Sequence, residues 1–356
     1  MTQENNQNQK QNKKIYWFLL LTIILILSIF LSALTGSAGL SIWDSFRMFI
    51  SEIPFFGKWV TIAETQTVYH KIVWEIRMPR IMMAGLTGYG LSIVGVAFQG
   101  IFKNPLADPH ILGTSSGAAL GATLAIMAGS LFPMTGLGVI GASAFLTSIL
   151  TVLLVYRIAC TGNRLSSVNM ILTGTAVSLM LSSFISLMMS LNHDQIEKVY
   201  LWTLGSFSAA GWEKVVFLFI LILPSSLGIL FFAKELDVIS TGDETAESLG
   251  IDTVRVRKII ILLASLMVAA CVSVSGIIGF VGLVVPHVMR MISGPKNKIL
   301  LPLSGVGGAV FVIVCDTLAR NLIAPSELPV GVITALIGAP YFVILLQRNK
   351  RKLGNG

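Results

Sequence analysis

The chain has 356 residues, of which 54% are hydrophobic and only 12% charged, and its mean hydropathy is +0.82. Soluble domains carry about 25% charged residues, so this chain lacks roughly half of the charge that keeps a soluble surface in water. The net charge of +8 does not indicate nucleic acid, because membrane proteins gather Lys and Arg in cytoplasmic loops. The composition predicts an integral membrane protein and excludes a cytosolic enzyme and a nucleic-acid-binding domain.

The amino-terminal region combines a polar head with the first apolar run. Residues 1–14 are rich in Asn, Gln and Lys, a composition typical of a disordered cytoplasmic head. Ile15–Leu34 carries no charge and is long enough to cross the hydrocarbon core as one helix. A cleaved signal peptide is the alternative, but the run is longer than a signal-peptide core and no small-residue cleavage site clearly follows it. We interpret it as a retained first span.

Further apolar runs of membrane-spanning length follow along the chain. We expect spans over residues 81–102, two within 109–156 separated by a turn at 129–133, and then 165–192, 215–233, 259–275, 278–291, 301–319 and 328–347. The prediction is an all-α polytopic membrane protein of about ten transmembrane helices. One transmembrane domain covers residues 15–347, and a basic cytoplasmic tail covers 348–356. With both termini cytoplasmic, most of the 25 Lys and Arg lie in cytoplasmic segments, as the positive-inside rule requires.

Ionisable residues within the apolar runs help to identify the energy source of a membrane transporter. Asp316 is the only carboxylate inside an apolar run, and Arg320 lies one helical turn later, so an i, i+4 ion pair is the expected role. A proton relay is the alternative, but a proton- or sodium-driven carrier lacks a second carboxylate here. The sequence contains no Walker A, HExxH or GxSxG motif, so neither ATP hydrolysis nor proteolysis is expected of this chain. The isolated Cys160, Cys271 and Cys315 lack metal-ligand spacing, and no metal site is predicted.

One cytoplasmic loop carries a large share of the acidic residues. Six of the 17 Asp and Glu fall within residues 234–258. Residues 242–251 are typical of a short helix, with acids in the first turn and Gly250 at the end. Ala246 and Leu249 lie three residues apart and give this helix a small apolar edge. The segment 240–251 is therefore either a coupling surface for a motor protein or a polar connector between two spans.

Several motifs, in one order along the chain, resemble a known family. The first half contains Arg77-Met-Pro-Arg80, Gly95 followed by Gln99, and Asn-Pro-Leu-Ala-Asp-Pro at the start of residues 104–118. The second half contains matching runs over residues 279–290, 316–320 and 327–340. These motifs resemble the FecCD family, the ABC-importer permeases for ferric siderophores, haem and cobalamin. The resemblance extends from about residue 77 to the end of the chain, whereas the first 76 residues match only in having one span and a loop.

The resemblance implies a type II importer permease of ten helices that works as a homodimer. An ATPase subunit dimer would bind on the cytoplasmic side, and an extracytoplasmic substrate-binding protein would dock outside. ATP and magnesium then belong to the ATPase partner, and this chain itself binds no cofactor. In the family the transport path lies at the dimer interface, which here implies residues 165–192 and 328–347. Residues 201–207 resemble the family's short re-entrant helix near the outer mouth.

The resemblance also assigns site residues. Arg77, Arg80 and Arg320 occupy the family's positions for docking the binding protein, where exposed arginines suit carboxylates, and anchoring of helix ends is the alternative. The helix that couples the permease to the ATPase corresponds to Asp243, Glu244, Ala246, Glu247, Leu249 and Gly250. The motif positions expected to be structural are Gln99, Asn104, Pro105, Asp108, Pro109, Gly113, Gly117, Pro286, His287, Asp316, Pro329 and Gly331.

A few of these positions have a direct physical interpretation. Asp108 is placed to cap the third span, with Pro109 as its first helical residue. Gly113 and Gly117 would let helices pack closely. His287 is expected to make a structural hydrogen bond rather than to bind haem or iron.

The sequence thus predicts a permease of an ABC importer in a bacterial plasma membrane, which is a transporter and not an enzyme. Its expected cargo is an iron chelate, a ferric siderophore first, with haem or cobalamin as alternatives. A proton-coupled secondary carrier, which belongs to another class of transporter, is the alternative function.

Overall fold

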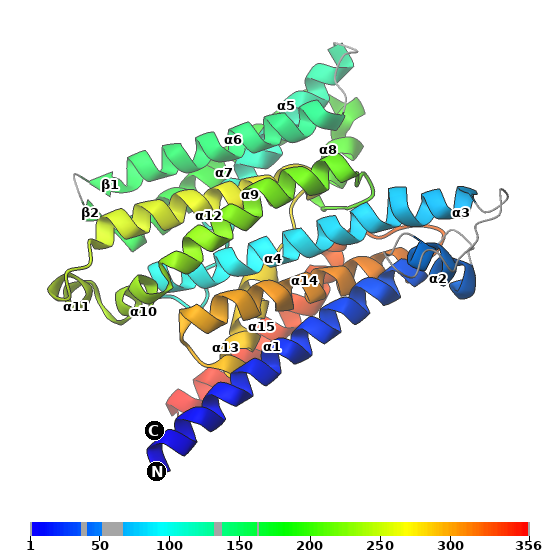
Figure 1. Ribbon diagram of the computed structural model, residues 1–356. Helices are drawn as coiled ribbons and strands as arrows, with labels where there is room; N and C mark the ends of the chain where they lie inside the picture. Colours follow the sequence, from blue (N-terminus) through cyan, green and yellow to red (C-terminus); the bar gives the residue numbers. More distant parts are fainter. Residues whose placement is uncertain (1, 37–40, 52–66, 132–136, 162–163, 355–356) are drawn as a thin grey trace.

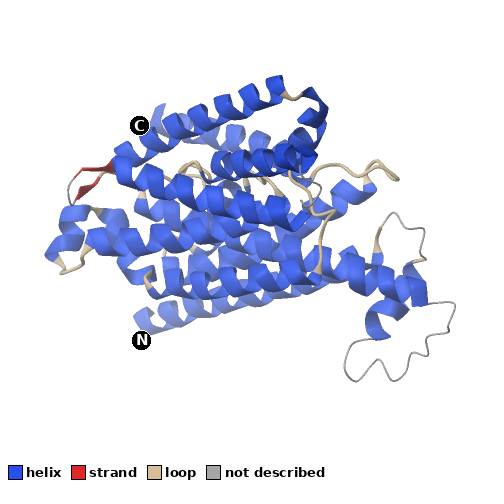
Figure 2. Cartoon of the chain, turned by 90° about the horizontal axis from the view of Figure 1, so that it is seen from above, coloured by secondary structure: helices blue, strands red, loops and turns tan. Residues whose placement is uncertain are grey.

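The computed structural model describes residues 2–36, 41–51, 67–131, 137–161 and 164–354 as a bundle of long helices that run along one common direction (Figure 1). Apart from a ribbon of two short strands at one end of the bundle (Figure 2), the described residues form helices and their connections. The first helix begins and the last helix ends on the same side of the bundle, an arrangement that an even number of spans requires (Figure 1).

The first half of the described chain contains α1 (Thr2–Leu34), α2 (Ile42–Ser51), α3 (Thr67–Lys71), the π-helical segment η3 (Ile72–Arg77), α4 (Met78–Ile101), α5 (Thr114–Leu131) and α6 (Leu137–Ala159). The ribbon of β1 (Cys160–Thr161) and β2 (Arg164–Leu165) is antiparallel. The second half contains α7 (Ser167–Leu191), the 3₁₀ turn η4 (His193–Gln195), α8 (Ile196–Thr203), α9 (Trp212–Phe231), α10 (Ala233–Thr241), α11 (Asp243–Ser248), α12 (Thr253–Ser275), α13 (Val281–Ser293), α14 (Asn297–Asn321) and α15 (Val330–Gly354).

The described helices have the length and composition of membrane spans. Seven of them are long and apolar enough to cross a membrane, and the longest is the continuous run Thr67–Ile101, which joins α3, η3 and α4. The shorter apolar helices α13 and Val330–Leu345 within α15 accompany them. The predicted class, an all-α polytopic membrane protein, is confirmed, while the count of ten spans stays a prediction.

The start of the chain differs from its predicted structure. Helix α1 begins at Thr2, so the backbone of residues 2–14 is helical where the composition predicts a disordered head. The physical reason is that a helix nucleated in the apolar run extends at little cost through Gln and Lys, which are good helix formers. Of the predicted turn at 129–133, residues 129–131 belong to α5, and residues 132 and 133 lie outside the described residues.

The third span begins later than predicted. Oδ1 of Asp108 accepts a hydrogen bond from the backbone N–H of His110 at 2.8 Å, so the carboxylate caps a local turn. Gly113 then has a φ of +77°, in the left-handed region, and α5 begins at Thr114. The expectation that Asp108 caps this helix with Pro109 as its first residue is therefore wrong, because the turn and the left-handed glycine separate them from the helix.

Helix α4 forms the centre of the bundle. Nearly all of its residues are buried, and it packs against α9, α12, α13 and α14. A Cβ added at Gly88 would overlap the carbonyl group of Gly308 in α14, and one added at Gly95 would overlap the backbone of Gly282 in α13. Lipid gives little hydrophobic drive for helices to associate, so close contact between small residues is what holds such helices together.

We expect Gly95→Ala to lower the thermal unfolding temperature of the purified protein in detergent, because the new methyl group would overlap the backbone of Gly282. Overpacking of this kind costs about 1–3 kcal/mol. Gly138→Ala is the matched control, since Gly138 is also helical and an added Cβ there meets no atom within 4 Å. Fluorescence-detected size-exclusion chromatography after heating measures the unfolding temperature of each variant. Equal unfolding temperatures for the two variants would contradict the packing assigned to α4.

Candidate functional site

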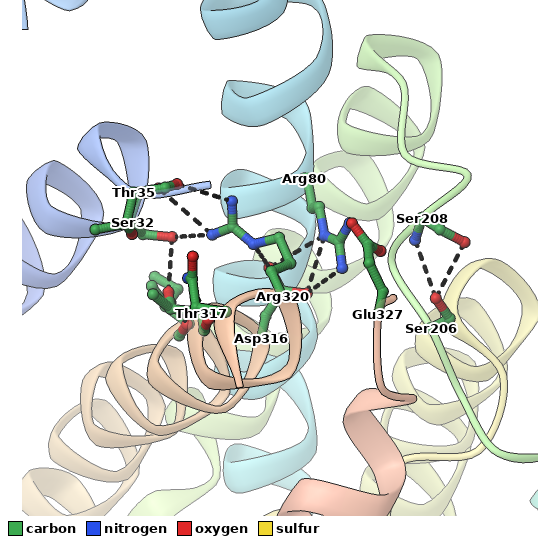
Figure 3. Close-up of polar contacts among 11 residues, drawn as sticks. Ser32, Thr35, Arg80, Ser206, Ser208, Asp316, Thr317, Arg320 and Glu327 are labelled. Carbon is green, nitrogen blue, oxygen red and sulfur yellow. Dashed lines mark hydrogen bonds and ion pairs between the residues drawn. The ribbon is translucent and has the colours of Figure 1, made fainter. Parts of the chain in front are cut away.

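A cluster of charged side chains lies where α4 begins and α14 ends. Figure 1 shows that α4 begins at the end of the bundle away from the termini. We refer to Arg77, Arg80, Asp316, Arg320 and Glu327 as the arginine cluster. The side chains come from η3, α4, α14 and the connection between α14 and α15. Figure 3 shows the last four of them pointing toward one another. Segments far apart in the sequence therefore meet at one polar site.

Arg80 binds both carboxylates of the cluster. Its Nε donates to Asp316 Oδ1 at 3.0 Å, and its Nη2 lies 2.9 Å from the same oxygen. Its Nη1 donates to Glu327 Oε2 at 2.8 Å and to Oε1 at 3.0 Å. Arginine suits this arrangement because its planar fork presents separate donors to separate carboxylates. One guanidinium thus joins α4 to α14 and to the start of α15.

Arg320 binds Asp316 from the other side. Its Nε lies 3.1 Å from Asp316 Oδ2 within α14, so the predicted i, i+4 ion pair is confirmed. The Asp316 side chain is only 1% exposed and is shared by two guanidiniums. Such sharing offsets the large cost of burying a carboxylate.

The cluster also binds the end of α1. Arg320 Nη2 donates to Ser32 Oγ at 2.6 Å, and Arg77 Nη1 donates to the backbone carbonyl of Ala33 at 2.9 Å. Arg77 Nη1 further donates to Ser45 Oγ in α2 at 3.2 Å. The last carbonyl groups of a helix lack hydrogen-bond donors within the helix, and the guanidinium of Arg77 supplies such a donor here.

The expectation that the three arginines are exposed is wrong. Arg77, Arg80 and Arg320 are 4%, 6% and 4% exposed. Their donors bind α1, Asp316 and Glu327 within the same chain. Arg80 and Asp316 lie far apart in the sequence, so no local pattern reveals their contact. Anchoring of helix ends, the alternative role, describes these contacts, and docking of a partner at the same residues stays a prediction.

We expect Asp316→Asn to destabilise the protein strongly, because both arginines around Asp316 would lose their buried counter-charge. Removal of one partner from a buried ion pair typically costs about 3–5 kcal/mol. Glu75→Gln in η3 is the control, since it removes an exposed carboxylate close to the same end. Thermal unfolding in detergent gives the unfolding temperature of each variant. An unfolding temperature as high for Asp316→Asn as for the control would show that Asp316 is not the counter-charge that holds the cluster.

The predicted coupling segment contains the short helix α11 (Asp243–Ser248). Glu244, Glu247 and Leu249 are exposed, Leu249 by 66%. Ala246 is buried and therefore does not form an outward apolar edge with Leu249, contrary to the sequence prediction. The turn after the helix ends at Gly250, whose φ of +80° is left-handed.

Asp243 fixes α11 to the rest of the bundle. Its Oδ1 lies 2.8 Å from Lys103 Nζ, just past α4, and accepts a hydrogen bond from Arg257 Nη2 in α12 at 2.6 Å. Burial alone would raise the pKa of this carboxyl group, but the hydrogen bond from Lys103 and the charge of Arg257 outweigh it, so the pKa of Asp243 is lowered. Asp243 is therefore charged at neutral pH and ties α11 to two central helices.

We expect the attachment of α11 to weaken only in acid. A carboxyl group with a lowered folded-state pKa contributes stability above its unfolded pKa, and the contribution is lost as the pH falls through the folded value. Asp243→Asn should therefore raise amide hydrogen exchange over residues 243–249 at pH 7. Wild type should match it only below about pH 4, after correction for intrinsic exchange.

The control for this measurement is Glu244→Gln, an exposed carboxylate in the same helix, which should exchange like wild type. Equal protection of wild type and Asp243→Asn at pH 7 would show that the carboxylate does not hold α11.

The irregular connection between α12 and α13 contacts several other segments of the chain. Residues 276–280 connect α12 to α13, and the backbone N–H of Ser206 donates to the carbonyl of Ser275 at 2.7 Å. Nε2 of His110 lies 3.1 Å from the carbonyl oxygen of Ile278. Phe280 precedes α13 with a φ of +67°. Irregular backbone at membrane depth must find its partners within the protein, and these contacts supply them.

Gln99 and two motif glycines lie at contacts between helices. Gln99 Nε2 donates to the carbonyl of Gly282 at 3.4 Å, and its Oε1 accepts from Arg290 Nη2 at 2.8 Å, which ties α4 to α13. At Gly117 an added Cβ would overlap α6, and at Gly331 it would overlap the backbone after α8. These motif positions are therefore packed closely inside the chain.

The remaining motif residues lie in turns and near helix ends. Asn104 Oδ1 accepts from the N–H of Leu106 at 2.9 Å, forming a local turn that includes Pro105. The ring of His287 meets the ring of Tyr341 edge-on, with centroids 6.4 Å apart, so α13 contacts α15 there. The hydrogen bond expected for His287 stays a prediction. Within the described ranges, no group of three or more His, Cys, Asp or Glu could hold a metal ion.

A cavity of about 790 Å³ opens beside the arginine cluster. Its walls include Ile126, Phe145, Trp202 and Phe217, and its charged lining residues are Lys198, Glu213, Lys214 and Glu327. Glu327 belongs to both the cavity and the arginine cluster, so the two features share a wall. The sequence did not predict this cavity, because its lining comes from five helices and three connections.

Comparison with known proteins identifies the family. The FecCD transport family matches residues 24–348. This chain belongs to the FecCD transport family. The match confirms the resemblance that began at Arg77 and extends it into the first span.

Individual FecCD relatives match over nearly the whole chain. The Bacillus subtilis ABC transporter permease YvrB, described as uncharacterised, is 40% identical over 92% of this chain and 92% of its own length. The molybdate import system permease MolB of Haemophilus influenzae is 35% identical over 93% of this chain and 95% of its own. A solved structure described as an inward-facing conformation of a metal-chelate type ABC transporter covers 93% of this chain and 98% of that one, with a TM-score of 0.80 and 32% identity.

The FecCD chain is therefore the membrane permease of an ABC importer and not an enzyme. It is a multi-pass protein of the inner membrane, and permeases of this kind work with an ATPase and a substrate-binding protein.

Proposed function

We propose that a homodimer of this FecCD permease imports a ferric siderophore across the bacterial plasma membrane. Membership in the family carries the proposal, because several relatives are named for chelated cargo. Their names specify Fe(3+)-citrate in Bacillus subtilis, Fe(3+) dicitrate in Escherichia coli, haemin in Yersinia pestis and cobalamin in Halobacterium salinarum. Haem, cobalamin and molybdate are the alternative cargoes of the same machine.

Separate ATPase subunits supply the energy in this proposal and hold the ATP and magnesium. The absence of a Walker A motif from the sequence supports this division. Asp316, the carboxylate on which a proton-coupled carrier would depend, has both oxygens bound by Arg80 and Arg320. Because both oxygens already contact guanidiniums inside the bundle, neither is left to line a path for protons, which disfavours that alternative.

The two ends of the bundle suit two different partners. At one end α11 exposes Glu244, Glu247 and Leu249, a small mixed surface that suits a cleft in the ATPase. At the other end the arginine cluster, although buried in this structure, carries more guanidiniums than carboxylates, and its net positive charge suits the carboxylates of a binding protein. Helix α4 extends from one partner surface to the other.

The apolar faces of α7 and α15 support the homodimer. Leu172, Leu179 and Leu187 of α7 are more than half exposed, as are Leu336 and Val343 of α15. The proposal assigns these faces to the contact with the second copy and to the transport path between the copies.

The deciding experiment is uptake into proteoliposomes that contain this permease, its ATPase and its binding protein. Ferric siderophore, ferric citrate, haem, cobalamin and molybdate are offered separately, with and without ATP. Uptake of the ferric siderophore that requires ATP would support the proposal, whereas ATP-dependent uptake of another cargo would change the substrate. Uptake that follows a proton gradient without ATP would overturn the mechanism.

We expect Leu249→Glu to reduce ATP-dependent uptake by about tenfold or more, because it replaces an exposed apolar side chain of the proposed coupling surface with a charge. Binding-protein association should be unchanged, since it occurs at the opposite end. Met291→Glu is the control, an exposed apolar residue in the last turns of α13 and outside α11. Uptake by Leu249→Glu equal to that of Met291→Glu would rule out the assigned coupling role.

A further inference from the structure

The arginine cluster contains more positive than negative charge. Its described side chains carry three guanidiniums but two carboxylates, and only Arg80 and Arg320 contact those carboxylates. Nη2 of Arg77 is buried and has no hydrogen-bond partner among the described residues. Buried donors without partners are costly, and uncompensated charge more so. The net positive charge of the cluster therefore suits an anionic partner.

The two carboxylates of the cluster are held very differently. Asp316 is 1% exposed, lies within α14 and is shared by two guanidiniums. The Glu327 side chain is 34% exposed, lies in the connection before α15, and forms its ion pair with Nη1 of Arg80. A partly exposed ion pair contributes far less than a buried one, so Glu327 returns to water at little cost. Glu327 is the carboxylate that can be exchanged.

The geometry at Arg80 separates these two roles. Nε and Nη2 are directed to Asp316 inside the bundle, while Nη1 alone is directed to Glu327 (Figure 3). A carboxylate that took the place of Glu327 on Nη1 would leave the contacts of Nε and Nη2 with Asp316 in place.

Glu327 lies next to the start of α15. The backbone N–H of Leu328 donates to the carbonyl of Ala319 at 3.0 Å, and α15 begins two residues later at Val330. Glu327, Leu328 and Pro329 also form part of the wall of the cavity. Release of Glu327 from Arg80 therefore removes a side-chain tie that fixes the beginning of α15 to α4.

We propose that Glu327 occupies, in the undocked permease, the place on Arg80 that a carboxylate of the binding protein takes on docking. The exchange leaves Asp316 in place, transfers Nη1 of Arg80 to the partner, and frees the connection that leads into α15. Glu327 is thus a positioning residue for docking, and its release transmits docking to a helix assigned to the transport path. The inference rests on the proposed function.

The first test measures the affinity of the binding protein for the permease–ATPase complex in nanodiscs by biolayer interferometry. The binding protein used is the one that stimulates ATP hydrolysis by this complex. Glu327→Gln should bind about two- to fivefold more tightly than wild type, because the internal competitor has lost its charge. Glu213→Gln is the matched control, since it removes an exposed carboxylate that lines the same cavity.

Equal affinities of the Glu327→Gln and Glu213→Gln variants would overturn the inference, because a general change in surface charge would then explain any gain. Weaker binding by Glu327→Gln would also overturn it. Failure of the wild-type complex to bind any binding protein would instead refute the proposed function, so the two failures are distinguishable.

A second test needs no variant. Amide hydrogen exchange over residues 324–329 of wild type is measured with and without saturating binding protein. Displacement of Glu327 should increase exchange in this connection by about twofold or more, although the partner covers the surface above it. Unchanged or slower exchange on docking would show that Glu327 stays on Arg80 and would overturn the inference.

Discussion

The shared carboxylate of Asp316 is the interaction on which the arrangement of this end of the bundle depends. Arg80 and Arg320 bind it from two helices, and through them α1 and Glu327 are held as well. In lipid, helices gain little from burying apolar surface against one another, so polar ties and close backbone contacts decide which helices meet. A single buried negative charge thus determines the relative positions of α1, α4, α14 and the start of α15.

Helix α4 connects the arginine cluster to the other end of the bundle. Arg80 lies in its first turn, and Lys103, just past its last residue, binds Asp243 beside α11. Between them the helix contacts α13 and α14 at glycines that leave no room for a side chain. Packing this close makes adjacent helices move together rather than bend independently. The arginine cluster and α11 are therefore attached to one rigid element.

The apolar runs predict most of the helices, because length and hydrophobicity largely determine a membrane span. The end of α12 at Ser275, the short helix α11 and the Asp316–Arg320 pair all depend on local sequence and are confirmed. The pairing of Arg80 with Asp316 joins residues 236 positions apart, and no local pattern contains it. For the same reason the burial of the arginines and the shared wall of the cavity emerge only from the folded chain.

The length of the central helix has a mechanical consequence. The continuous run Thr67–Ile101 has 35 residues, which at 1.5 Å per residue gives about 50 Å, against about 30 Å for the hydrocarbon core. A substantial part of it therefore stands outside the bilayer or the whole rod is inclined. Rotation of such a rod by about 10° around its midpoint moves its two ends by about 4–5 Å in opposite directions. The π-helical turn at Ile72–Arg77 lies where the largely exposed first turn of this rod joins the packed part.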